Sequence, residues 1–143
     1  MHKSFGSSQY SIYGQIDAAY HTAATKVGLS DTELDIFYVI CVKGEPCLQS
    51  AIYKMTGATR STVNSAIKKM ERDGIIHLEA GTGRNANITL TEKGKALSAS
   101  TAEKIIAIEN SVYDEWSKEE QEFFVRMNAD FCTRIKKQFE ERL

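Results

Sequence analysis

Apolar residues recur every three or four positions near the N-terminus, and this spacing predicts a helix over residues 10–27. Residues 1–9 are expected to be loose, and Gly28 supplies a stop signal. A second helix is expected after Ser30, which forms a capping-box pattern with Glu33. It is apolar on most sides, so we expect it to lie centrally and to end at residues 44–46. The apolar stripe of the first helix is Tyr13, Ile16, Tyr20, Ala23 and Val27, and the second helix carries Leu34, Phe37, Tyr38, Ile40 and Cys41.

Two shorter helical stretches follow, separated by a tight break at residues 56–58 that contains Gly57. The first runs over residues 49–55, and the second is capped by Thr59, runs to Asp73 and stops at Gly74. Two helices joined by a short turn with a glycine form a helix-turn-helix. The second of them has one apolar face, made of Val63, Ala66, Ile67 and Met70.

The next segment has the composition and alternation of strands. Residues 75–79 form a β-rich run, residues 81–85 form a turn, and residues 87–90 alternate polar and apolar side chains. This predicts a two-stranded hairpin with a flexible tip, which would make the module a winged helix. One helix is expected from Thr91, carrying Leu97, Ile105 and Ile108. A capping box at Ser117 opens a last helix with the apolar stripe Phe124, Met127, Phe131, Ile135 and Phe139.

These elements predict a mainly α fold with a small β-hairpin wing. We expect a winged helix-turn-helix lobe at residues 44–94. It is flanked by N-terminal helices at residues 1–43, expected to be a dimerisation arm and a support helix, and by C-terminal helices at residues 95–143, expected to serve dimerisation. The small central lobe cannot cover both terminal apolar stripes. Packing in a homodimer would bury them, and packing on each other within one chain is the alternative.

Composition limits the class of protein. The chain has 143 residues, of which 42% are hydrophobic and 26% charged, as in a soluble globular protein. Three cysteines, the absence of a signal-peptide pattern and the absence of a membrane-length apolar run predict a reduced, cytoplasmic protein without membrane contact. The net charge of −1 does not indicate any class of partner, but residues 54–84 include six basic and three acidic residues. The central lobe is therefore locally positive.

The polar face of the helix after Thr59 has the chemistry that duplex DNA requires. Short hydrogen-bonding groups near its N-terminus suit base edges in the major groove, and cations follow towards its C-terminus. A solvated helix face without a partner is the alternative. The candidate DNA-binding residues are Gln49, Ser50, Thr59, Arg60, Ser61, Thr62, Asn64, Ser65, Lys68, Lys69, Arg84 and Asn85.

Residues 48–76, Gly83-Arg84-Asn85 and the Leu-Thr-Glu-Lys-Gly run at 90–94 resemble the multiple-antibiotic-resistance regulator (MarR) family. The resemblance covers nearly the whole chain, and its most specific parts are residues 60–63, residues 71–76 and the wing arginine. It implies a homodimeric transcriptional regulator, more often a repressor than an activator. Its recognition helix would enter the major groove and Arg84 the minor groove of a pseudopalindromic operator.

The resemblance also implies an effector and shows one departure. The family often has an aspartate two residues before the wing arginine, where this chain has Thr82, so the usual acid–arginine brace is missing. Members typically sense small, often aromatic molecules in a cleft between the dimer arms and the DNA-binding lobe. The candidate residues for such a ligand are Tyr13, Tyr20, His21 and Tyr38, although aromatic residues at helical spacing are more often core.

No cofactor, metal site or catalytic activity is expected, because the three histidines are far apart and no nucleophile or phosphate-loop motif is present. Two alternatives to a ligand-responsive regulator remain. One is a winged-helix protein-interaction module that never binds DNA. The other is a thiol-based redox regulator, for which Cys47, in a turn after a proline, is expected to be more exposed than a buried Cys41.

Overall fold

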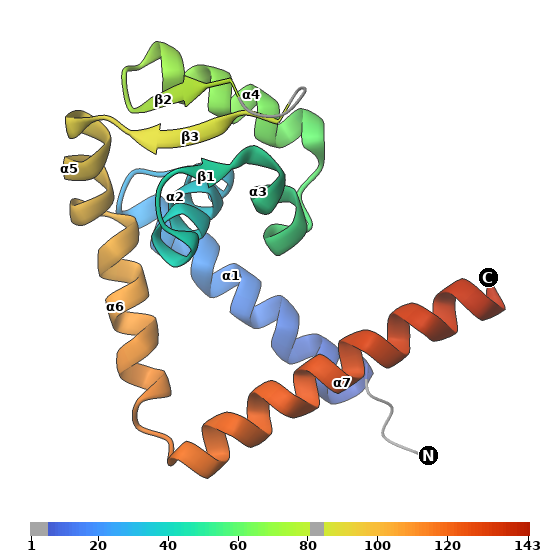
Figure 1. Ribbon diagram of the computed structural model, residues 1–143. Coiled ribbons are helices and arrows are strands. Elements are labelled where there is room, and N and C mark those ends of the chain that lie inside the picture. The colour runs from blue at the N-terminus through green and yellow to red at the C-terminus, as the bar shows by residue number, and fades with distance from the viewer. Residues whose placement is uncertain (1–5, 81–84) are drawn as a thin grey trace. The chain divides into compact units, whose positions relative to one another are not determined.

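The computed structural model describes residues 6–80 and 85–143 and is mainly α-helical with a small antiparallel sheet, as predicted (Figure 1). It forms two compact units, Met1–Ile106 and Ala107–Leu143. The elements are a π-helical turn (Gly6–Tyr10), α1 (Ser11–Lys26), α2 (Asp31–Lys43), β1 (Cys47–Leu48), α3 (Gln49–Thr56), α4 (Arg60–Arg72), β2 (Ile76–Glu79), β3 (Asn87–Leu90), α5 (Glu92–Ser100), α6 (Ala102–Tyr113) and α7 (Lys118–Arg142).

Local capping signals set most helix ends where the sequence predicts them. The Ser30 hydroxyl accepts a hydrogen bond from the Glu33 amide at 3.1 Å, and the Glu33 carboxylate accepts one from the Ser30 amide at 3.1 Å. Ser117 forms the same capping box at the start of α7. Gly28, just after α1, has a φ of +80°, a conformation that side chains with a Cβ rarely adopt. The start of the chain differs from the expectation, because residues 6–9 continue α1 as a π-helical turn.

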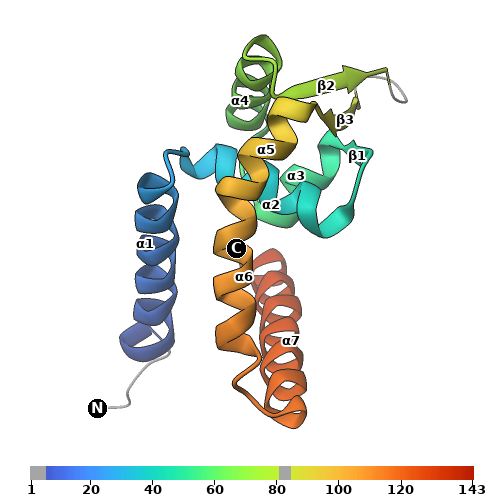
Figure 2. The same ribbon diagram turned by 90° about the vertical axis from the view of Figure 1, so that its left-hand side faces the viewer.

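The core of the first unit is built around α2, which lies centrally as predicted. Ile36 and Phe37 are fully buried, and α2 packs against α1, α3 and α4. Helix α4 contributes Val63, Ile67 and Met70, all buried on one face as its spacing predicts. Figure 2 shows α1 at one edge of this unit and the β2–β3 ribbon at the opposite edge.

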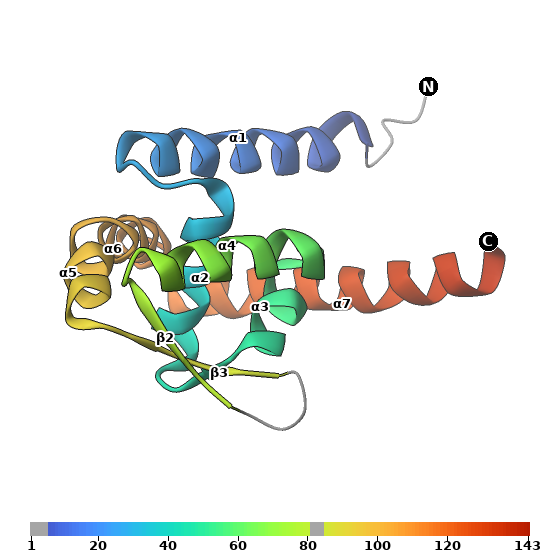
Figure 3. The same cartoon turned by 90° about the horizontal axis from the view of Figure 1, so that it is seen from above.

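The wing has three strands in the order β1–β3–β2, where the sequence predicted two. In the added pair, Cys47 lies opposite Ile88. In the predicted pair, the register runs from Ile76 opposite Leu90 to Glu79 opposite Asn87. A strand of two residues is too short to show an alternation in sequence, which is why β1 was missed. Viewed from above, the β2–β3 ribbon and α1 lie on opposite sides of α4 (Figure 3).

The exposures predicted for two cysteines are reversed. Cys47 is in β1 and only 2% exposed, whereas Cys41, near the end of α2, is exposed. The Sγ of Cys41 lies 3.6 Å from the Ser98 hydroxyl. The apolar neighbours of Cys41 in sequence do not reveal that the residue is exposed.

The single helix expected from Thr91 is broken into two at Thr101. The backbone there has φ −129° and ψ −90°, outside the helical region, and separates α5 from α6. The Thr101 hydroxyl donates to the Leu97 carbonyl at 2.6 Å. Such back-bonding by threonine competes with regular helix hydrogen bonds and bends helices. The apolar spacing of residues 97–108 does not reveal this break.

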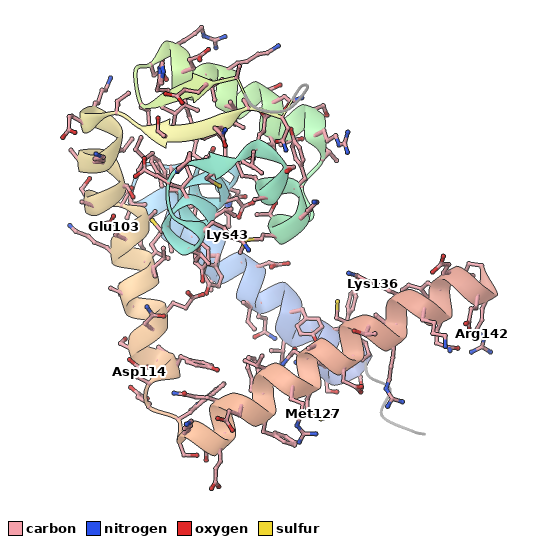
Figure 4. The ribbon with its side chains drawn as sticks, in the orientation of Figure 1. Lys43, Glu103, Asp114, Met127, Lys136 and Arg142 are labelled. Atoms are coloured by element: carbon pink, nitrogen blue, oxygen red, sulfur yellow. The ribbon has the colours of Figure 1, made fainter. Side chains whose placement is uncertain are left out.

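The second unit is a helical corner followed by the long helix α7. The Gln121 side chain donates to the Tyr113 carbonyl at 2.9 Å, and Trp116 packs edge-on against Phe124 with ring centroids 5.0 Å apart. Helix α7 is described throughout and has no buried residue. Met127, labelled in Figure 4, is 44% exposed and belongs to the predicted apolar stripe. None of the described helices is long and apolar enough to cross a membrane.

Candidate nucleic-acid interface

Helix α4 is fixed to the core on one face and leaves its polar face exposed. Thr59 caps it, because its hydroxyl oxygen accepts a hydrogen bond from the Thr62 amide at 3.3 Å. Val63, Ile67 and Met70 anchor the buried face, so the helix cannot rotate about its axis without losing core contacts. The exposed residues are Thr59, Arg60, Ser61, Thr62, Ser65, Lys68, Lys69, Glu71 and Arg72. These include seven of the predicted DNA-binding residues.

The cations on α4 are available for a partner. Among the residues that the structure describes, the ion pairs found do not include Arg60, Lys68, Lys69 or Arg72. Arg60 instead places its guanidinium 5.7 Å from the ring centre of Tyr53, within the range of a cation–π contact. An exposed helix face with unpaired cations and hydroxyls can bind phosphate oxygens and base edges.

Asn64 is half-buried and differs from the other polar residues of α4. Its Oδ1 accepts a hydrogen bond from the Tyr53 hydroxyl at 2.7 Å and a second from Nε2 of Gln49. Gln49 Nε2 also donates to the Tyr53 hydroxyl at 2.7 Å. We call this three-residue ring the Gln49–Tyr53–Asn64 cluster. Tyr53 was not among the predicted residues, and its position one turn after Gln49 on α3 was the available signal.

The root of the wing is held to the start of α3 by two predicted residues that bond to each other. The Asn85 Oδ1 accepts from the Ser50 amide at 3.0 Å, and its Nδ2 donates to the Ser50 hydroxyl at 3.0 Å. The Gln49 amide also donates to the Ala86 carbonyl at 2.9 Å. Ser50 and Asn85 therefore fasten the wing to α3. Arg84 and Thr82 lie outside the described residues.

These contacts surround a hollow between α3, α4 and the wing, with a volume of about 610 Å³. Ile67, from the buried face of α4, supplies an apolar wall, and Arg60 and Lys68 supply positive charge. The structure brings six predicted residues together here and leaves Thr59, Ser61, Thr62, Ser65 and Lys69 on the remaining surface of α4. The lining residues are Gln49, Ser50, Tyr53, Arg60, Asn64, Ile67, Lys68, Leu78 and Asn85.

The thiols of Cys41 and Cys47 do not have the setting of reactive thiols. Burial raises the pKa of the Cys47 thiol, and the Lys43 ammonium lowers it by less. Partial burial also raises the pKa of the Cys41 thiol, with the Ser98 hydrogen bond opposing it. A raised pKa reduces the thiolate fraction, and thiolate is the reactive form. Within residues 6–80 and 85–143, no group of three or more His, Cys, Asp or Glu side chains is placed to hold a metal ion.

The effector candidates lie on α1 and α2. Tyr20 is half-buried and packs against the core, and Tyr13 is half-buried two turns earlier on α1. His21 is exposed, and its Nδ1 lies 2.8 Å from Oδ1 of Asp31, which joins α1 to the first turn of α2. Tyr38 is half-buried on α2. Tyr20 therefore has a packing role and His21 a helix-linking role.

Solved structures share this fold at low sequence identity. A MarR family regulator from Neisseria meningitidis superposes with a TM-score of 0.84 at 18% identity, over 98% of this chain and 99% of that chain. The M. tuberculosis regulator MosR in complex with DNA gives 0.59 at 23% identity, over 94% and 96%. NadR in complex with 4-hydroxyphenylacetate gives 0.71 at 12% identity, over 91% and 93%.

Sequence comparison identifies the same family over a shorter stretch of the chain. Residues 27–84, from the end of α1 into the wing, match the MarR family model. No curated protein matches the chain significantly. The matched stretch contains α2, α3, α4 and β2. This match covers less than half of the chain, and the chain shares its winged-helix fold with solved regulators of the MarR family.

Proposed function

We propose that this protein binds duplex DNA with α4 in the major groove and regulates transcription from that site. The observation that carries the proposal is the exposed face of α4, where hydroxyl groups near the N-terminus and unpaired cations towards the C-terminus stand on a helix fixed to the core. Hydroxyl groups match base edges, and Lys68 and Lys69 match phosphates. MosR, which shares the fold, was solved in complex with DNA.

The protein acts in this proposal as a homodimer. The apolar side chains left exposed on α7 include Phe124, Met127 and Phe139, and Ile12 and Ile16 are exposed on α1. A second copy that packs against these helices would remove this apolar surface from water. Two α4 helices in such a dimer would meet half-sites about 34 Å apart, one turn of the double helix. The operator is then a pseudopalindrome, with Arg84 of each wing in the flanking minor groove.

The regulator is a repressor that a small aromatic effector releases. NadR, another protein of this fold, was solved with 4-hydroxyphenylacetate, a phenolic acid. The aromatic and imidazole side chains of Tyr13, Tyr20, His21 and Tyr38 are the candidates for contact with such a molecule. An effector that binds better to one arrangement of the lobes shifts the dimer towards it and lowers the affinity for adjacent grooves.

Selection of bound sequences from a random pool of duplex DNA tests the proposal. The purified protein should enrich a pseudopalindrome with half-sites one turn apart. With that operator, Thr62→Ala should relax base preference, whereas Lys68→Ala should weaken binding to all sequences and reduce the log–log salt slope by about 0.9. Lys104→Ala, an exposed lysine on α6, is the matched control and should change neither.

Two results would contradict DNA binding. One is the absence of any enriched sequence, together with binding that does not weaken as salt rises. The other is an equal effect of Lys68→Ala and Lys104→Ala, because both would then be ordinary surface charges. Either result would favour a winged-helix module that binds another protein. Sedimentation of the free protein would separately test the homodimer, since a monomer at micromolar concentration would contradict it.

A further inference from the structure

The donor hydrogens that Gln49 and Tyr53 direct into the Gln49–Tyr53–Asn64 cluster are all used within it. Nε2 of Gln49 has two hydrogens, and one goes to the Tyr53 hydroxyl and the other to Oδ1 of Asn64. The Tyr53 hydroxyl donates its single hydrogen to the same Oδ1 at 2.7 Å. Both lone pairs of the Asn64 oxygen are therefore occupied by groups of α3.

On Asn64 itself, the amide nitrogen remains for a partner outside the cluster. Among the residues that the structure describes, none accepts a hydrogen bond from Nδ2 of Asn64. Asn64 lines the hollow between α3, α4 and the wing, beside Lys68 one turn further along α4. Asn64 therefore presents hydrogen-bond donors, and no acceptor, to a ligand in the hollow.

This orientation changes which base an asparagine can recognise. An unconstrained asparagine reads adenine with two hydrogen bonds, because its oxygen accepts from N6 and its nitrogen donates to N7. Asn64 cannot form the first bond while Oδ1 is occupied. Guanine offers two acceptors, O6 and N7, on its major-groove edge. A side chain that only donates matches guanine.

We propose, on the basis of the proposed DNA-binding function, that Asn64 reads guanine as a hydrogen-bond donor and that Tyr53 and Gln49 determine this specificity from α3. Asn64 is the contacting residue, and the other two are positioning residues. The cluster joins two helices that both pack on the core, so the amide is held in one orientation before DNA arrives. A group ordered in advance loses less conformational freedom on binding.

Tyr53→Phe is the test, because it removes one donor to Asn64 and keeps the aromatic ring beneath the Arg60 guanidinium. Wild type, Tyr53→Phe and Asn64→Ala are each used to select from the same random duplex pool. In the wild-type site, one position of each half-site is guanine, and Asn64→Ala loses preference at that position alone. Tyr53→Phe shifts that position from guanine towards adenine by on the order of tenfold, because the freed lone pair can accept from N6.

Two further variants make the result decisive. Gln49→Ala removes the other donor to Asn64 and shifts the same position in the same direction. Tyr10→Phe, a tyrosine that is 71% exposed before α1, leaves the selected site unchanged. Thermal unfolding of each variant confirms that it is folded at the selection temperature, and if Tyr53→Phe is not, Gln49→Ala carries the test.

The outcomes separate this proposal from the function on which it rests. If wild type enriches no sequence, DNA binding itself is wrong. If wild type enriches a site, the specificity proposal is overturned by either of two results. The first is that Asn64→Ala weakens binding to all sequences alike, which makes Asn64 purely structural. The second is that Tyr53→Phe and Gln49→Ala both retain the wild-type base at every position, which shows that the cluster does not determine the base preference.

Discussion

Gly94 should be intolerant of any side chain, although it lies in the first turn of a helix. A Cβ built on Gly94 would lie 2.0 Å from the backbone oxygen of Ile75 and 3.0 Å from its carbonyl carbon. The contact is between backbones, so no flexible side chain can move aside. Gly94→Ala would have to push α5 away from residue 75 by about 1 Å to reach the 3.0 Å that real Cβ contacts respect.

The expected loss combines overpacking with broken hydrogen bonds. The Thr91 hydroxyl donates to the Gly74 carbonyl at 2.6 Å, and the Thr91 amide donates to the Ile75 carbonyl at 3.0 Å. Overpacking costs about 1–3 kcal/mol, and a weakened hydrogen bond costs about 1 kcal/mol. The higher helix propensity of alanine than of glycine offsets up to about 1 kcal/mol of this loss. Gly94→Ala should therefore lower the free energy of unfolding by roughly 1–3 kcal/mol.

Urea denaturation followed by circular dichroism measures this loss, at one fixed protein concentration because dimerisation would shift the midpoint. Gly14→Ala is the matched control. Gly14 is also helical, in α1, and its added Cβ would meet nothing within 4 Å. It should raise the free energy of unfolding by up to about 1 kcal/mol. If Gly94→Ala were as stable as Gly14→Ala, the close approach between α5 and residue 75 would be wrong.

Three further predictions concern side chains outside the proposed interface. Burial, and secondly the Asp31 carboxylate, raises the pKa of the Asp35 carboxyl group. Above about pH 4 the unfolded chain loses this proton more readily than the folded protein does, so the free energy of unfolding falls as pH rises. Asp35→Asn should thus be more stable than wild type at pH 7 and equal to it below about pH 3.5 in denaturant titrations, and a gain at both pH values would contradict the shift. Cys47, which is buried, should resist alkylation in the folded protein under conditions that label Cys41. Mass spectrometry of digested peptides measures the two rates, and faster labelling of Cys47 would contradict the prediction. Ser30→Ala should lower the free energy of unfolding by about 1 kcal/mol through loss of the capping box, whereas an unchanged urea midpoint would mean that water replaces the cap.

The parts of the fold that sequence predicts well are those fixed by local interactions. The capping boxes at Ser30 and Ser117 form between residues three apart, so the sequence contains both partners of each hydrogen bond. The buried face of α4 follows from the spacing of Val63, Ile67 and Met70, which is set by helix geometry alone. Gly28 and its positive φ likewise depend on one residue. None of these features needs knowledge of the rest of the chain.

The features that were missed depend on residues far apart in sequence. β1 exists because Cys47 pairs with Ile88, 41 positions later, and two residues show no alternation of their own. The exposure of Cys41 depends on which side of α2 the other helices cover. Thr101 breaks a helix whose apolar spacing continues through it. In each case the local pattern fits more than one structure, and tertiary packing selects between them.

The candidate interface shows the same division in its polar residues. Thr62 and Asn64 are both small polar residues near the start of α4, and helix geometry alone gives each a plausible role at the DNA. Thr62 is exposed, but the oxygen of Asn64 is occupied by Tyr53, which lies 11 positions earlier on a different helix. Ser50 and Asn85 likewise use hydrogen-bonding groups on each other, although they are 35 positions apart in sequence. These groups are therefore not free to contact DNA.

The Ser50–Asn85 contact bears on the wing arginine, for which the sequence lacks the usual brace. Thr82 cannot form the acid–arginine pair that the resemblance to the MarR family implies, and that absence predicts a loosely held Arg84. Asn85, the next residue, is fixed by two hydrogen bonds to Ser50 at the start of α3. The support for the wing thus comes from its root and from α3, the same helix that orients Asn64, so α3 connects both DNA-reading elements of the proposed interface.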